Sequence, residues 1–146
     1  MNRENAKEAT LLLLRLAAAF IFIPVGGLKL FGWFGGLPPN GGTAPLVSEI
    51  GLAGILEVFG GILILIGLFT RPVAFILSGE MAVAYWQAHA PHGWLPLLNH
   101  GEPAVLLCFI YLFFAAHGAG VFSLDAMLKN RRAAGPRATT EPVAQI

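Results

Sequence analysis

The chain has 146 residues, of which 56% are hydrophobic and only 12% charged, and its mean hydropathy is +0.72. A soluble domain carries about twice that charged fraction, so the composition indicates an all-α integral membrane protein. Net charge is +1 and no basic run is interleaved with aromatic residues, which argues against a nucleic-acid partner. The single cysteine, Cys108, excludes a disulfide framework and a thiolate metal cluster.

Two apolar runs in the first half of the chain predict membrane-spanning helices over about residues 10–30 and 50–70. Each holds about twenty apolar residues, which is enough to cross a bilayer. The first run carries Arg15 and Lys29, which helical periodicity puts on one face. The second carries a single carboxylate, Glu57. Because a carboxylate facing lipid is costly, we expect its face to point into a helix bundle.

Small residues surround this carboxylate on the predicted second helix. Glu57 shares a face with Gly60, Gly61 and Ile64, at helical offsets of three, four and seven. Glycines leave room for a neighbouring helix, or for a ligand, to approach closely. The run Thr70-Arg71-Pro72 is then expected to stop the helix with a charge and a turn.

Two further helices are predicted over about residues 72–89, with Glu80 near the middle, and over about residues 103–122. The four helices form one predicted transmembrane domain, residues 1–125. The remaining segment, residues 126–146, is basic and then polar, which is typical of a partly disordered tail.

Basic residues lie on one side of this predicted topology. They are Arg3, Lys7, Arg71, Lys129, Arg131, Arg132 and Arg137. The two loops of the other side, residues 31–50 and 89–103, contain no Lys or Arg. The positive-inside rule therefore puts both termini in the cytoplasm and the two aromatic loops outside.

This orientation sorts the membrane-embedded charges by depth. Arg15 and Glu80 fall about 7 Å and 12 Å from the inner ends of their helices, so we expect them to form a structural ion pair. Lys29, Glu57 and Glu102 fall nearer the outer side. Buried charges need partners, and the outer group is either a second structural cluster or a polar ligand site.

The ligand-site interpretation has six candidate residues on that side: Lys29, Glu57, Gly60, Gly61, Glu102 and His89. In this interpretation the charged groups bind a polar head group and the two glycines make room for a ring.

A metal site is the less favoured interpretation of the outer loop. His89 and His92 are three residues apart, with His100 and Glu102 downstream. Because Pro91 interrupts a helix between the first two histidines, they need not share a face. We therefore expect no metal site.

Several short segments resemble one known family. Lys29-Leu-Phe-Gly32 is similar to the end of the first helix in the DoxX family of small four-helix bacterial membrane proteins. Glu57-Val-Phe-Gly-Gly61 with Gly67-Leu-Phe-Thr-Arg71 resembles its second-helix signature. Trp94-Leu-Pro-Leu-Leu-Asn-His-Gly-Glu102 and Ser123-Leu-Asp125 resemble its third loop and its end. The chain departs from the pattern at Val25, where many members have a histidine.

The resemblance implies an inner-membrane location and one of two roles. DoxX-like proteins are associated with quinone-linked oxidoreduction, including the small subunit of thiosulfate:quinone oxidoreductase, and with thiol redox defence. The wider superfamily also contains chaperones and cargo receptors. The first hypothesis is thus a quinone- or small-molecule-binding subunit, with a bound quinone and no intrinsic cofactor. Its partners are the lipid bilayer and other oxidoreductase subunits, or further copies of itself.

The second hypothesis is a non-enzymatic assembly or interaction protein, in which the charged pairs only hold the helices together. The two hypotheses differ in one structural feature. A ligand-binding protein is expected to have an outward-opening pocket lined by Glu57 and Lys29, and an assembly protein is expected to have this region closed.

Overall fold

The computed structural model describes residues 2–134, and these residues form helices, turns and loops without a strand. The long helical elements are α1 (Arg3–Phe31), α2 (Glu49–Ile55), the π-helix η2 (Leu56–Gly60), α3 (Gly61–Ile66), α4 (Thr70–Ala84), the π-helix η3 (Tyr85–His89), α6 (Glu102–His117) and α7 (Leu124–Ala133). Short turns of helix lie in the loops: η1 (Trp33–Gly35), η4 (Ala90–His92) and α5 (Pro96–Asn99).

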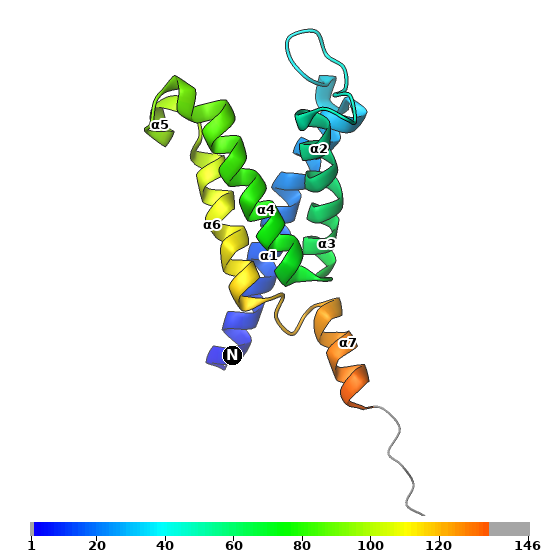
Figure 1. The fold of residues 1–146 in the computed structure, drawn as a ribbon. Coiled ribbons are helices and arrows are strands. Elements are labelled where there is room, and N and C mark those ends of the chain that lie inside the picture. Colours follow the sequence, from blue (N-terminus) through cyan, green and yellow to red (C-terminus); the bar gives the residue numbers. More distant parts are fainter. Residues whose placement is uncertain (1, 135–146) are drawn as a thin grey trace, which may run out of the picture.

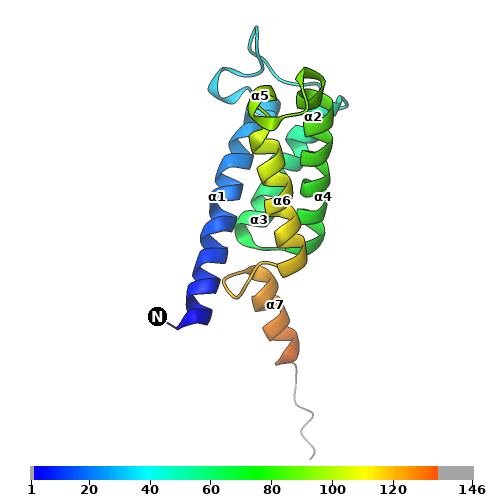
Figure 2. The same ribbon diagram turned by 90° about the vertical axis from the view of Figure 1, so that its left-hand side faces the viewer.

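The helices associate as two pairs. The continuous stretch α2–η2–α3 packs along α1, and α4 packs along α6. Figure 1 shows the two pairs meeting at one end of the molecule and diverging toward the other. We call the first the basic end, because Arg71 and α7 lie there. The second is the aromatic end, which carries Trp33 and Trp94. Figures 1 and 2 both show α7 leaving the molecule at the same end as the N-terminus.

The first helix begins earlier than the expected start at residue 10. Its polar first turns are helical because the Asn2 side chain caps them, accepting a hydrogen bond from the Glu4 N–H at 2.9 Å. The helix ends at Gly32, which adopts the left-handed conformation with φ of 69°. One face of α1 is buried, and it carries Arg15, Ala18, Ala19, Phe22 and Gly26.

The second helical stretch ends earlier than predicted. Gly67 stops it in a left-handed conformation with φ of 68°, a conformation that glycine adopts without steric cost. The run Thr70-Arg71-Pro72 does not stop this helix; it forms the first turn of α4. Proline suits that position, because its missing N–H has no partner in the first turn of a helix.

The last predicted helix also differs from the structure. It begins at Glu102 as expected, but ends at His117 instead of residue 122, because Gly118 leaves the helical conformation with φ of 85°. A loop leads to Ser123, whose side chain caps α7 by accepting from the Ala126 N–H at 3.2 Å. Part of the predicted tail is therefore helical. Residues 135–146 of that tail lie outside the described residues.

Candidate functional site

The buried charge Glu57 pairs with Lys29. The Lys29 Nζ donates to Glu57 Oε1 at 2.6 Å, which joins the last turns of α1 to η2. Glu57 is only 1% exposed, whereas the Lys29 side chain keeps 21% of its surface accessible. The structure therefore brings together two of the predicted site residues in a largely desolvated ion pair.

Two glycines make this pairing possible. A Cβ atom on Gly26 would lie 2.8 Å from the Gly54 carbonyl oxygen and from the Glu57 Cβ, so α1 and the second helical stretch approach closely there. One turn further along α1, Lys29 then reaches across to the carboxylate. Glu57 itself lies in the π-helical turn η2, a local irregularity that is frequent at functional sites.

Glu80 lies at the same depth as Glu57. A Cβ on Gly60 would meet the Leu77 side chain at 2.7 Å, so Gly60 and Leu77 lie at the same depth along the helix axes. The second helical stretch and α4 run antiparallel. Glu57 and Glu80 each lie three residues from this contact, toward the aromatic end. Glu80 thus belongs with the predicted outer group.

The predicted ion pair between Arg15 and Glu80 is wrong. Arg15 is buried at the basic end, where its guanidinium donates to the Ala119 carbonyl and, at 2.6 Å, to the Phe122 carbonyl. Gly26 packs at the level of Glu57, and Arg15 lies about 16 Å further along α1. That separation along the helix axis keeps Arg15 out of reach of Glu80.

A tyrosine that sequence reasoning missed completes the cluster. Tyr111 of α6 is fully buried, with its ring centroid 4.9 Å from that of Phe22. It belongs to the same buried core as Leu77, which lies three residues before Glu80 on α4. Its phenol is the one hydroxyl in the otherwise apolar sequence of α6, and this feature of the sequence could have identified Tyr111 as a candidate. We call Lys29, Glu57, Glu80 and Tyr111 the buried polar cluster.

Several polar atoms of this cluster have no hydrogen-bond partner among residues 2–134. They are Glu57 Oε2, both carboxylate oxygens of Glu80 and the Tyr111 hydroxyl, and all are shielded from solvent. An unpaired buried polar atom costs on the order of 1–3 kcal/mol, and native proteins tolerate few of them. Three helical segments bring these atoms into one region, so the cluster offers binding capacity for a polar group.

Gly60 and Gly61 do not provide open space for a ring, contrary to the ligand-site interpretation. A Cβ on Gly61 would lie 2.7 Å from the Ile23 side chain, and Gly60 packs against Leu77 in the same way. Both glycines serve the close approach of helices.

Glu102 and His89 do not join the cluster either. Glu102 is exposed in the first turn of α6 and forms no side-chain hydrogen bond or salt bridge within the described part of the chain. The His89 Nδ1 is hydrogen-bonded to the Asn99 carbonyl at 3.0 Å. Glu102 and His89 were grouped with Lys29 because all three were predicted on the outer side, but a shared side did not bring them into contact.

Asn99, a second residue that sequence reasoning missed, organises the aromatic-end loop. It is buried, donates to the Gly93 carbonyl at 2.6 Å and accepts from the Gly101 N–H at 2.8 Å. Tyr85 donates to the Trp94 carbonyl at 2.6 Å in the same loop. The loop segment Trp94–Glu102, which resembles the DoxX pattern, therefore has a structural role. Among residues 2–134, no group of three or more His, Cys, Asp or Glu side chains is placed to hold a metal ion.

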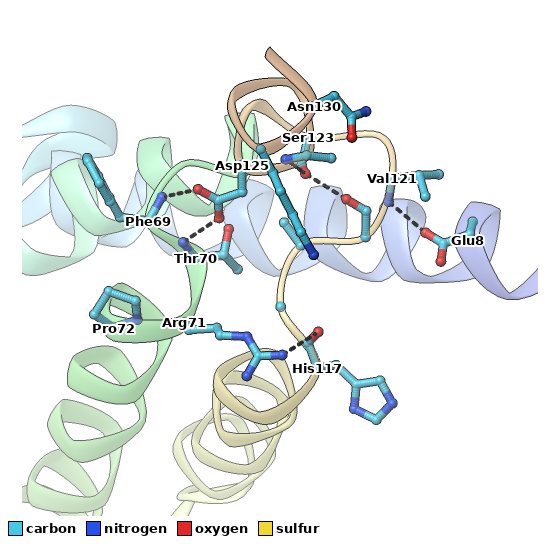
Figure 3. A pocket seen from close by; sticks show the side chains of 15 residues that line it. Glu8, Phe69, Thr70, Arg71, Pro72, His117, Val121, Ser123, Asp125 and Asn130 are labelled. Carbon is cyan, nitrogen blue, oxygen red and sulfur yellow. Dashed lines mark hydrogen bonds between the residues drawn. The ribbon is translucent and has the colours of Figure 1, made fainter. Parts of the chain in front are cut away.

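At the basic end, Asp125 joins α7 to the beginning of α4. Its two carboxylate oxygens accept from the Phe69 N–H at 2.8 Å and the Thr70 N–H at 2.9 Å (Figure 3). The Asp125 N–H in turn donates to the Gly67 carbonyl at 2.9 Å. Two segments quoted for their family resemblance thus contact each other directly.

Two cavities are well defined, and neither is lined by Lys29 or Glu57. One lies at the basic end (Figure 3). The other is an apolar groove of about 480 Å³ along α1 and α3, lined by Leu16, Phe20 and Leu65 among others. Neither cavity is the outward-opening pocket expected of a ligand-binding protein, and the unpartnered oxygens of the buried polar cluster are shielded from solvent.

The outer surface identifies the class of protein. Two helical stretches, Arg3–Phe31 and Glu49–Ile66, are long and apolar enough to cross a membrane, and Glu102–His117 is a shorter apolar helix. Large apolar side chains on them point outward, for example Phe20, which is 78% exposed. Apolar helices with an apolar outer surface and a charged interior define an integral membrane protein.

This membrane protein belongs to the DoxX family, whose model matches residues 10–90. A protein of Haemophilus influenzae described as uncharacterized is 39% identical over 128 residues, which cover 85% of this chain and 94% of the relative. The inner membrane protein YphA of Escherichia coli is 31% identical over 129 residues, or 82% and 91% of the two chains. No solved structure matches the chain.

The geometry predicts that Arg15 and Glu80 are energetically independent. Arg15→Leu should lower the free energy of unfolding by on the order of 3 kcal/mol, because two carbonyls lose their donor. Adding Glu80→Leu should not restore stability, and the coupling energy should stay within about 0.5 kcal/mol of zero. Unfolding of the purified protein in detergent micelles measures both values.

The matched control is the cycle of Lys29→Met and Glu57→Gln, which removes a real ion pair. Here the double variant should recover part of the loss that either single variant causes. If Glu80→Leu restored the stability lost in Arg15→Leu, this would contradict the separation of Arg15 from Glu80.

Proposed function

We propose that this chain is a quinone- or small-molecule-binding subunit of a membrane oxidoreductase or redox-defence complex in the bacterial inner membrane. The observation that carries the proposal is the set of buried oxygens of Glu57, Glu80 and Tyr111 that have no hydrogen-bond partner among residues 2–134. A structural ion pair alone requires only Lys29 and Glu57, and it leaves Glu80 and Tyr111 unexplained. A polar head group between these helices would satisfy them.

The chemistry of the four side chains suits a quinone head group. Quinone carbonyls accept hydrogen bonds, which the Lys29 ammonium and the Tyr111 hydroxyl can donate. The hydroxyls of the reduced form donate, and Glu57 Oε2 and the Glu80 carboxylate can accept. A bound quinone would supply the electron transfer, while these side chains hold the head group and exchange protons with it. The electrons themselves pass to or from a partner subunit.

Entry of a ligand requires the two helix pairs to move apart. The pairs already diverge toward the aromatic end (Figure 1), and the cluster lies between this end and the basic end, where Asp125 and Arg15 tie the elements together. A small separation of α2–η2 from α4 would therefore expose Glu57 and Glu80 without breaking those contacts.

One observation favours the alternative, a non-enzymatic assembly protein. The unpartnered oxygens of the cluster are shielded from solvent, and Gly60 and Gly61 pack against Leu77 and Ile23. In this case the charged residues only align the helices, and the function lies in contacts with other membrane proteins or with further copies of this chain.

The proposed topology has four membrane crossings, formed by α1, α2–η2–α3, α4–η3 and α6. Its support is the charge distribution: Arg71, Lys129, Arg131 and Arg132 all lie at the basic end, whereas residues 31–50 and 89–103 contain no Lys or Arg. The positive-inside rule then places the basic end and both termini in the cytoplasm. The similarity to an inner membrane protein of Escherichia coli supports this location.

Cysteine labelling tests this topology. Single cysteines at Gly41 and Gly93, in a Cys108→Ser background, should react with an impermeant maleimide added to spheroplasts whose inner membrane is intact. A cysteine at Ala134 should react only after the membrane is permeabilised. The reverse pattern would place the basic end outside and contradict the proposal.

The function itself is tested by Glu57→Gln. This change keeps the size of the side chain but removes the charge-assisted hydrogen bonds to a head group. We expect the variant to be monodisperse. Its content of co-purifying lipid-soluble ligand should fall at least about tenfold below that of the wild type, which corresponds to a loss of about 1.4 kcal/mol in binding free energy. Mass spectrometry of organic extracts from the native complex measures it.

The matched control is Glu49→Gln, an exposed carboxylate in the first turn of α2 on the same helical stretch. It should retain the ligand at the wild-type level. Equal ligand content in wild type and a well-folded Glu57→Gln protein would support the assembly-protein alternative instead.

A further inference from the structure

A cavity of about 610 Å³ lies at the basic end, remote from the buried polar cluster. Its walls are the first turn of α4, the loop that follows α6 and the first turns of α7, with Glu8 of α1 at one side (Figure 3). The cavity is thus formed where segments from four parts of the chain meet.

The acidic side chains of this cavity accept hydrogen bonds from backbone N–H groups. Both oxygens of Asp125 accept from the N–H groups of Phe69 and Thr70, and Glu8 Oε2 accepts from the Val121 N–H at 2.8 Å. These acids therefore hold the walls in place. Their hydrogen bonds to N–H groups offset part of their negative charge.

The cationic side chains, in contrast, remain available. Lys129 is exposed and forms no side-chain hydrogen bond or salt bridge within residues 2–134. Arg71 has a single long hydrogen bond, 3.4 Å from its Nη2 to the His117 carbonyl. The available charges of the cavity are positive.

The Thr70 hydroxyl is an independent indication of a ligand-binding site. It lines the cavity and its residue surface is 0% exposed, yet its Oγ1 has no hydrogen-bond partner among the described residues. A buried hydroxyl without a partner is uncommon in folded proteins. An oxyanion in the cavity would accept its hydrogen bond.

We propose that this cavity binds the phosphate group of a phosphate ester, held by Arg71, Lys129 and the Thr70 hydroxyl. Guanidinium and ammonium groups both form charge-assisted hydrogen bonds with phosphate oxygens. Exposed apolar side chains, Phe69 and Val121, lie beside these donors. The same chemistry occurs in an anionic phospholipid head group and in a soluble phosphate ester, and the experiment separates these two sources.

The test measures thermal unfolding of the full-length protein in phosphatidylcholine nanodiscs. One arm adds phosphatidylglycerol to the discs, and the other adds glycerol 3-phosphate to the buffer at constant ionic strength. We expect stabilisation in at least one arm. Stabilisation in the lipid arm alone identifies a head-group site, and stabilisation by glycerol 3-phosphate identifies a site open to soluble esters.

Variants assign the effect to the cavity. Arg71→Gln with Lys129→Gln should weaken the apparent affinity at least about tenfold, because two charged hydrogen bonds are lost. Thr70→Val, which removes the hydroxyl at nearly constant volume, should weaken it by roughly severalfold. Lys129→Gln alone changes an exposed, unpaired side chain, so it tests the site even where the double variant is unstable.

The control removes the same charge outside the cavity. Arg131→Gln with Arg132→Gln, also exposed on α7, should leave the stabilisation unchanged. Two results would overturn the proposal. One is equal weakening by the control and the cavity variants, which indicates diffuse attraction to α7. The other is the absence of stabilisation by either probe.

Discussion

The ion pair between Lys29 and Glu57 is the constraint on which the membrane-embedded part of the structure depends. An ionised carboxylate without a partner in a low-dielectric interior costs several kcal/mol, so Glu57 needs its cation within hydrogen-bond distance. That requirement fixes how closely α1 and η2 approach, and the approach in turn requires glycine at position 26, where a Cβ would collide with the backbone of α2. The helix register then places Glu80 beside the pair.

The two ends of the molecule have different physical characters. At the basic end, Arg15 and Asp125 bind backbone groups of other elements and tie α1, α4 and the segment after α6 together. Toward the aromatic end the helix pairs diverge (Figure 1). The hydrogen bonds of Asn99 there go to Tyr85, Gly93 and Gly101, within the loop that joins α4–η3 to α6. The hydrogen bonds that join the two helix pairs are therefore concentrated at the basic end.

Helical periodicity was sufficient to predict the buried faces, since Arg15 and Glu57 are each inward on the stripe that their spacing defines. It was insufficient for the pairing of charges. The predicted Arg15–Glu80 pair rested on the depth of each residue in the membrane, counted from the predicted end of its own helix. Relative depth is instead set by contacts between helices, such as that of Gly60 with Leu77. Tyr111 was missed because an aromatic residue in an apolar run usually indicates packing. Only the tertiary structure shows that its hydroxyl has no hydrogen-bond partner within the described part of the chain.

The central claim, that the buried polar cluster binds a quinone-type head group, is tested most directly by photo-crosslinking. A quinone with a photoreactive group is added to native membranes and irradiated, and the labelled peptides are identified by mass spectrometry. If the cluster binds the head group, labelling is expected in η2, α4 and α6 around Glu57, Glu80 and Tyr111, and excess unlabelled quinone should suppress it. Labelling confined to outward-facing residues such as Leu16 and Phe20, or unaffected by the competitor, would contradict the claim.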